Sequence, residues 1–294
     1  AIIMIKKRKF GIIGGDLRAL YLAKSLNKDG NEVRICGTEK LNSQQIFQTD
    51  TPDNVINSSD YIILPTPVTR DNKTINAPYS LKELLIDKKF LDSVKGKIIF
   101  GGIIPDILKQ IDKKVKNKSY SVEDYYTENF KILNSIPTAE GAIKIALEEK
   151  HSTICQSKCL VIGYGKIGKI LSKILKNMGA YVTVSARKST DRAWACAEGY
   201  KSINILETQE IYDYDFIFNT VPHILLNENI LKSLRKDVLI IDLASPPGGV
   251  DKEAASKLNI KSIHALAIPG KYFPESAAEI IKSEIYSIMK EKNL

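Results

Sequence analysis

The run CLVIGYGKIG at residues 159–168 joins an apolar, strand-like segment to three closely spaced glycines. Residues 166–178 then show the apolar periodicity of a helix. In this strand–glycine–helix context, a G-x-G-x-x-G pattern is typical of a dinucleotide site. The first glycine permits a tight turn, the second lets the backbone approach a pyrophosphate, and the third packs helix against strand. The alternative is a glycine turn kept only for packing. We predict that the cofactor is bound by Gly163, Tyr164, Gly165, Lys166, Ile167 and Gly168.

The next strand-like run, residues 181–184, indicates which dinucleotide is bound. An NAD site commonly has Asp or Glu about 20 residues after the glycines, where it accepts a hydrogen bond from the ribose 2′-OH. Here the strand ends in SARKST at residues 185–190, which holds cations and hydroxyls but no carboxylate. This chemistry suits a 2′-phosphate, so we predict NADP rather than NAD, bound with the help of Arg187, Lys188 and Ser189.

Strand-like apolar runs alternate with helix-like segments along the whole chain, which is typical of parallel sheets covered on both faces. We expect an α/β protein with two doubly wound, parallel-sheet (Rossmann-like) domains and a cleft between them. Residues 1–132 would form a substrate domain, and residues 133–294 an NADP-binding domain that includes a linker helix and a C-terminal helix. Residues 134–141 are expected to form a loop at the joint between the domains, and Pro137 within it to start the linker helix. The C-terminal helix, about residues 274–290, either packs back on the first domain or covers its own sheet.

Composition excludes several classes of protein. The 294 residues are 44% hydrophobic, and no apolar run reaches the roughly 18–20 residues that a membrane span requires. The net charge of +9 comes mainly from scattered lysines, so we expect neither nucleic acid nor membrane as a partner. The four cysteines lack the second Cys/His pair of a zinc site, and we expect no metal and free thiols in the cytoplasm.

A second glycine corner, GIIGGDLR, occupies residues 11–18 but lacks the three-glycine spacing. Asp16 could cap the helix that follows, and Arg18 could be only a surface cation. Arg18 would nevertheless lie at the carboxyl edge of a sheet, where open α/β sheets bind ligands, and a guanidinium can hold a carboxylate. We therefore single out Arg18 as a candidate carboxylate anchor.

Four motifs together with the glycine-rich turn resemble the dipicolinate synthase A-subunit family of spore-forming bacteria. They are GGDxR at residues 14–18, NSIPTxEG at 134–141, the DLAS-P-GG loop at 242–249, and the PG pair at 269–270. The resemblance covers nearly the whole chain. It departs at Ala19, where the family often has Gln.

The resemblance implies an NADP-dependent oxidoreductase of sporulation, acting in the mother-cell cytoplasm on a branch of lysine biosynthesis. It implies oxidation of dihydrodipicolinate to dipicolinate in a heteromeric complex with a second, flavoprotein-like dipicolinate synthase subunit. Homo-oligomerisation stays open. A dicarboxylate requires cationic or N–H-rich anchors, and the candidates are Arg18, Ser135, Thr138, Ser245, Gly248 and Gly249.

Hydride removal must be coupled to proton loss, so a general acid/base is expected. His223 follows a strand end beside Thr220, Val221 and Pro222, which we expect near the nicotinamide. Glu140 is the second candidate, although a carboxylate in the first turn of a helix could simply stabilise the helix dipole. His264 and Asp242 are expected to be structural.

Two other functions stay open. One is a different two-domain NAD(P) enzyme, such as a 2-hydroxy-acid dehydrogenase. The other is a non-catalytic nucleotide-binding protein whose partner performs the chemistry.

Overall fold

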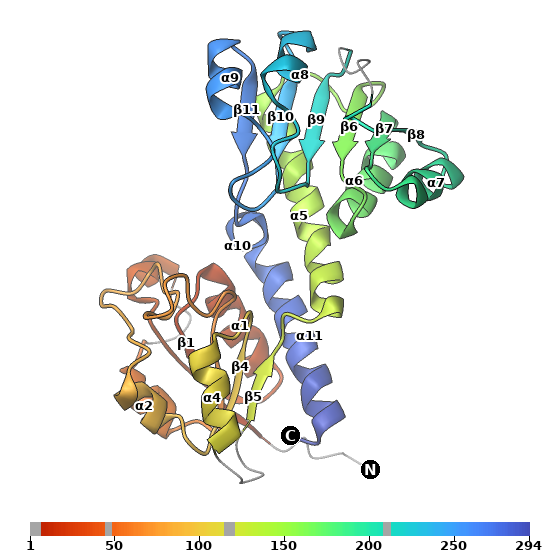
Figure 1. Ribbon diagram of the computed structural model, residues 1–294. Coiled ribbons are helices and arrows are strands. Elements are labelled where there is room, and N and C mark those ends of the chain that lie inside the picture. Colours follow the sequence, from red (N-terminus) through yellow and green to blue (C-terminus); the bar gives the residue numbers. More distant parts are fainter. Residues whose placement is uncertain (1–6, 45–48, 115–120, 208–212) are drawn as a thin grey trace. The chain divides into compact units, whose positions relative to one another are not determined.

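The computed structural model describes residues 7–44, 49–114, 121–207 and 213–294. The chain divides into two compact units. The first comprises residues 1–131 and 273–294, and the second comprises residues 132–272. Each unit is built on one parallel sheet (Figure 1).

The first unit has a five-stranded sheet in the order β2-β1-β3-β4-β5, with parallel pairing throughout. Its strands are β1 (Lys9–Ile13), β2 (Glu32–Cys36), β3 (Tyr61–Ile63), β4 (Ile98–Gly101) and β5 (Ser121–Asp124). Its helices are α1 (Leu17–Lys28), the 3-10 segment η1 (Glu39–Gln44), α2 (Pro52–Asn57), α3 (Lys88–Ser93), α4 (Asp106–Lys114) and α11 (Pro274–Lys292). The strand order reverses between β1 and β3, and open α/β sheets bind ligands at such a point.

Side chains from one strand enter two separate cores. Phe10 and Ile12 of β1 pack with α1 and α11, whereas Ile13 packs with α2, α3 and α4. Successive residues of a strand point to opposite faces, so a continuous apolar run implies a sheet covered on both sides. The C-terminal helix α11 packs against α1 in the first unit (Figure 1). It is therefore part of the first unit.

The second unit has a six-stranded parallel sheet in the order β11-β10-β9-β6-β7-β8. Its strands are β6 (Lys158–Ile162), β7 (Tyr181–Ser185), β8 (Lys201–Ile203), β9 (Phe216–Asn219), β10 (Leu239–Asp242) and β11 (Lys261–His264). Its helices are α6 (Lys166–Asn177), α7 (Ser189–Ala197), α8 (Glu228–Ser233), α9 (Lys252–Lys257) and α10 (Ile268–Tyr272). This order is that of a dinucleotide-binding Rossmann sheet. The prediction of two doubly wound sheets is confirmed.

One expectation about the joint is wrong. Residues 134–141 do not form a loop, and Pro137 does not start a helix, because α5 runs without interruption over Glu128–Glu149. Pro137 lies inside it, where its missing N–H leaves the carbonyl of Leu133 without its usual helical donor. Ala139, Ala142 and Ala146 of the same helix pack in the core of the second unit.

Among the described residues, no helix has the length and apolarity needed to span a membrane. The same residues contain no cluster of three or more His, Cys, Asp or Glu side chains suited to a metal ion.

Candidate active site

The three glycines of the second unit play three different structural roles. Gly163 directly follows β6 and has a φ of +99°, a conformation that favours glycine, and its N–H donates to the Ser185 carbonyl at 2.8 Å. A Cβ on Gly168 would overlap the carbonyl oxygen of Gly163, so helix and strand approach as closely as glycine allows. A Cβ on Gly165 would meet nothing within 4 Å.

Gly165 is the N-cap residue of α6, and no side chain caps this helix. The first N–H groups of a helix have no partner within the helix and carry a partial positive charge. The open space at Gly165 therefore lies against a helix end suited to a phosphate.

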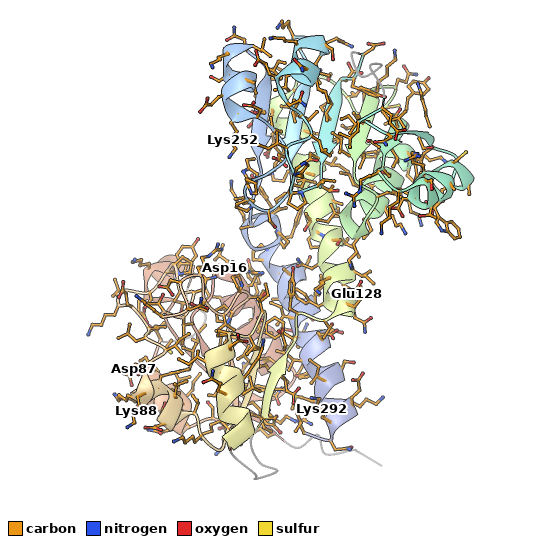
Figure 2. All side chains as sticks on the ribbon, viewed as in Figure 1. Asp16, Asp87, Lys88, Glu128, Lys252 and Lys292 are labelled. Carbon is orange, nitrogen blue, oxygen red and sulfur yellow. The ribbon has the colours of Figure 1, made fainter. Side chains whose placement is uncertain are left out.

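The first unit differs at the same point of its own sheet. There Asp16 is the N-cap residue of α1, and its carboxylate accepts a hydrogen bond from the Arg18 backbone N–H at 3.0 Å (Asp16 is labelled in Figure 2). A negative charge already at this helix end repels a phosphate. The second unit is therefore the better nucleotide site.

Thr220 lies at the point where the strand order of the second sheet reverses, between β6 and β9. Its backbone N–H and its hydroxyl both donate to the Ile162 carbonyl at 2.9 Å. Its side chain also lies where a Cβ on Gly163 would be. Val221 is half-buried and Pro222 is exposed. The structure thus brings the loop after β9 against the glycine turn, as the cofactor prediction requires.

The cationic segment after β7 is exposed at Arg187, Lys188 and Ser189. Lys188 is the N-cap residue of α7, and no side chain caps that helix. Sequence reasoning missed Arg192, whose Nη1 donates to the carbonyls of Ala186 at 2.9 Å and Arg187 at 2.7 Å. Its position four residues after the N-cap, one helical turn on, was the available signal. Arg192 adds a positive charge to this turn.

Tyr164 is 5% exposed, and its hydroxyl donates to Glu198 at 2.7 Å. Burial, followed by this carboxylate, raises the pKa of the Tyr164 phenol well above its ordinary value. Tyr164 therefore ties the glycine turn to the end of α7. Lys166 and Ile167 are half-buried in the first turn of α6.

The loop after β10 is organised around Asp242, which is 1% exposed. Its carboxylate accepts hydrogen bonds from the Gly249 N–H at 2.8 Å and from Asn219 Nδ2 at 2.8 Å. The Gly248 N–H donates to the Ser245 carbonyl at 2.9 Å. Both glycine N–H groups are thus used within the chain, whereas Ser245 is exposed.

The two histidines beside the strand ends differ. Both ring nitrogens of His264 are engaged, Nε2 with the Ala244 carbonyl at 2.7 Å and Nδ1 with Lys252 Nζ at 3.1 Å. His223, in the loop after β9, is exposed, and its ring makes no hydrogen bond within the described residues. His223 is therefore the one with a ring available to a ligand.

The three candidates on α5, namely Ser135, Thr138 and Glu140, differ in their exposure and hydrogen bonding. Ser135 is 4% exposed, and the Thr138 hydroxyl donates to the Asn134 carbonyl at 2.9 Å. Glu140 is exposed but lies in mid-helix, not in a first turn, so it cannot act on the dipole at the start of the helix.

A small cavity lies where the strand order of the first sheet reverses. Its lining includes Gly14 and Gly15, which follow β1, and Thr66, in the loop after β3. Arg18 and Tyr125 also line it. The centre of a water molecule can occupy about 20 Å³ of it, which is room for one or two waters. The Tyr125 hydroxyl, which sequence reasoning missed, donates to the Leu64 carbonyl at 2.9 Å.

Known proteins resemble both units. Residues 9–122 match the family model of the N-terminal domain of the dipicolinate synthase A-subunit, and residues 145–267 match that of shikimate/quinate 5-dehydrogenase. The second match, together with the Rossmann sheet, indicates a nicotinamide nucleotide cofactor.

Three of the matches that span nearly the whole chain are to dipicolinate synthase A-subunits. The dipicolinate synthase A-subunit of Bacillus subtilis is 30% identical over 98% of both chains. The crystal structure of that Bacillus subtilis protein has a TM-score of 0.81 at 29% identity, covering 99% of this chain and 98% of that one. The Bacillus halodurans A-subunit structure has a TM-score of 0.81 at 27% identity, covering 96% of this chain and 98% of that one. The two doubly wound units and the open glycine turn are consistent with these relatives. The chain belongs to the dipicolinate synthase A-subunit family.

Proposed function

We propose that this chain oxidises dihydrodipicolinate to dipicolinate with NADP as the hydride acceptor. The observation that supports it most strongly is the uncapped N-terminus of α6 at Gly165, with open space beside it, in a chain of this family. When bound, the nicotinamide supplies the hydride acceptor. The chain's own residues bind, orient and move protons.

The choice of NADP over NAD rests on charge. Arg187, Lys188 and Arg192 place positive charge at the end of β7, where an NAD site has an acid. Guanidinium groups suit a phosphate because they present parallel donors. Ser189, the first residue of α7, adds a hydroxyl.

Substrate binding is assigned first to Arg18, a cation that lines the cavity of the first unit. A space for one or two waters suits a single carboxylate group and leaves the ring outside it. Ser245 is the other exposed candidate. Gly248 and Gly249 shape the loop that presents it. Ser135, which is buried, and Thr138, whose hydroxyl bonds within α5, are the weaker candidates.

Oxidation of the dihydro ring removes one hydride and one proton and gives the aromatic pyridine. We assign the proton to His223, because its ring is exposed beside Thr220 and Pro222 at the strand reversal. Glu140 is the second candidate. If the substrate is the hydroxylated tetrahydro ring, the same groups serve the loss of water that precedes oxidation.

The family name denotes one component of a larger enzyme. We propose that the partner is a second, flavoprotein-like dipicolinate synthase subunit, in the mother-cell cytoplasm of a sporulating bacterium. The substrate would come from the lysine branch.

The test uses the purified chain with and without this second subunit, supplied with the dihydro or hydroxylated substrate and with NADP or NAD. We expect dipicolinate and reduced nicotinamide to form in equal amounts, faster with NADP. The result against the proposal is a nucleotide that binds without turnover even when the flavoprotein-like partner is present, since that outcome indicates a non-catalytic protein. Turnover of 2-hydroxy acids instead would assign the chain to another class of dehydrogenase.

A further inference from the structure

Asp16 and Arg18 form a close pair at the start of α1. Asp16 Oδ1 accepts from Arg18 Nε at 2.8 Å, and Asp16 Oδ2 accepts from Arg18 Nη2 at 2.9 Å. The same Oδ1 accepts the Arg18 backbone N–H at 3.0 Å. One carboxylate thus caps the helix and holds the guanidinium by two parallel bonds.

A count of donors shows what the pair leaves available. A guanidinium has five N–H donors. The Nε donor and one Nη2 donor go to Asp16, and the other Nη2 donor goes to the Thr66 carbonyl at 3.3 Å. Both donors of Nη1 remain, and neither has a partner within the described residues. Only the Nη1 end is therefore available to a ligand.

The surroundings of Arg18 explain why its guanidinium needs a charged partner such as Asp16. The Arg18 side chain is 15% exposed, and it lies in a cavity whose other walls include Ile12, Ile63 and Tyr125. Burial by itself lowers the pKa of Arg18, but the hydrogen bonds and charge of Asp16 outweigh it, and the pKa is raised. Without Asp16 the guanidinium would keep its charge but lose the contacts that fix its orientation.

We propose that Asp16 is a positioning residue that turns the Nη1 end of Arg18 toward one carboxylate of the substrate. The proposal rests on the proposed function and adds to it the mode of binding: end-on, through Nη1, with the Thr66 carbonyl sharing Nη2. A simple N-cap does not require a carboxylate, because Ser, Thr or Asn caps a helix equally well. Asp16 is needed for its second oxygen, which an amide or hydroxyl lacks.

The experiment is a double-mutant cycle on the full-length chain, with dipicolinate itself as the titrant in a calorimeter. Asp16→Asn keeps a capping oxygen but places an N–H₂ group opposite Nη2, where two donors repel. We expect about tenfold weaker dipicolinate binding, since an interaction with a charged group is lost. In an Arg18→Ala background, Asp16→Asn should cause no further loss. Asp16→Ser, whose hydroxyl can also cap α1, should likewise weaken dipicolinate binding in the wild-type background and cause no further loss in the Arg18→Ala background.

NADP(H) affinity and the melting temperature of each variant separate this role from a structural one. A cap alone would give the same loss in both backgrounds, and that result overturns the proposal. Tighter dipicolinate binding by Asp16→Asn in the wild-type background would also overturn it, because Asp16 would then act as a competitor of the substrate. If wild-type protein binds NADP(H) but not dipicolinate, the proposed substrate fails, and this inference fails with it.

Discussion

The carbonyl oxygen of Gly163 lies where a Cβ atom on Gly168 would have to be. Gly165, between them in the sequence, faces open space. The two later glycines of the motif therefore have different predicted roles, Gly168 in close helix–strand packing and Gly165 in cofactor binding. Substitutions at the two positions should separate stability from affinity.

Gly168→Ala should destabilise the protein by roughly 1–3 kcal/mol, the usual cost of an overpacked site. The gain of about 1 kcal/mol in helix propensity does not offset this, because the overlap is with backbone rather than with a movable side chain. Thermal unfolding measures the change. An unchanged melting temperature would show that α6 moves away freely.

Gly165→Asp should instead keep the protein stable and weaken NADP(H) binding. It gives α6 the carboxylate cap that Asp16 gives α1, so stability should be kept or slightly raised. NADP(H) affinity should fall by about 100-fold or more, since the carboxylate occupies and repels the phosphate position. Gly165→Ser is the uncharged control and should bind better than Gly165→Asp. The single tryptophan, Trp194, lies on α7 of the same unit and offers a fluorescence signal for the titration.

Arg187→Gln should weaken NADP binding about 10- to 100-fold and leave NAD binding nearly unchanged, because only the 2′-phosphate loses a charged partner. Lys257→Gln is the matched control. Lys257 ends α9, and helices that follow parallel strands end at the opposite edge of the sheet from the ligand. Equal losses for both nucleotides in Arg187→Gln would contradict the assignment of this segment.

His223→Ala should lower kcat by about 10²- to 10⁴-fold, the usual contribution of a general acid/base, with a much smaller effect on KM. His151→Ala is the control, since His151 is exposed at the start of the loop between α5 and β6 and has no proposed role. If Glu140→Gln lowers kcat more than His223→Ala does, the proton-transfer role belongs to α5.

Thiol chemistry should follow burial. Cys155 and Cys196 are exposed and should react with a thiol reagent in the folded protein, whereas Cys36 and Cys159 should react only after unfolding. Burial raises the pKa of Cys36 to about 12 and that of Cys159 to about 11. Because these pKa values are raised, the stability from the neutral thiols is complete below pH 9, the ordinary thiol value. Each thiol should then lower the free energy of unfolding by about 1.4 kcal/mol per pH unit up to its folded pKa. Cys36→Ala should reduce this dependence.

The sequence by itself determined the architecture, because a strand buried on both faces must be apolar throughout. It therefore located the inner strands and the glycine turn with their helices. It missed β5 (Ser121–Asp124) and β8 (Lys201–Ile203), each of which is one of the two outer strands of its sheet, although it located the other outer strands, β2 and β11. An outer strand has a neighbour on one side only, so its sequence can be short and polar.

Only the tertiary structure decided which candidate groups are available to a ligand. The motif at 134–141 is typical of a loop, yet packing of Ala139 and Ala142 on the second sheet keeps it helical despite Pro137. The N–H groups of Gly248 and Gly249 are used by Ser245 and Asp242, and three of the five donors of Arg18 are used by Asp16 and Thr66. The physical reason is that local sequence fixes which donors a residue carries, whereas long-range contacts between strand-end loops fix which of them are already paired.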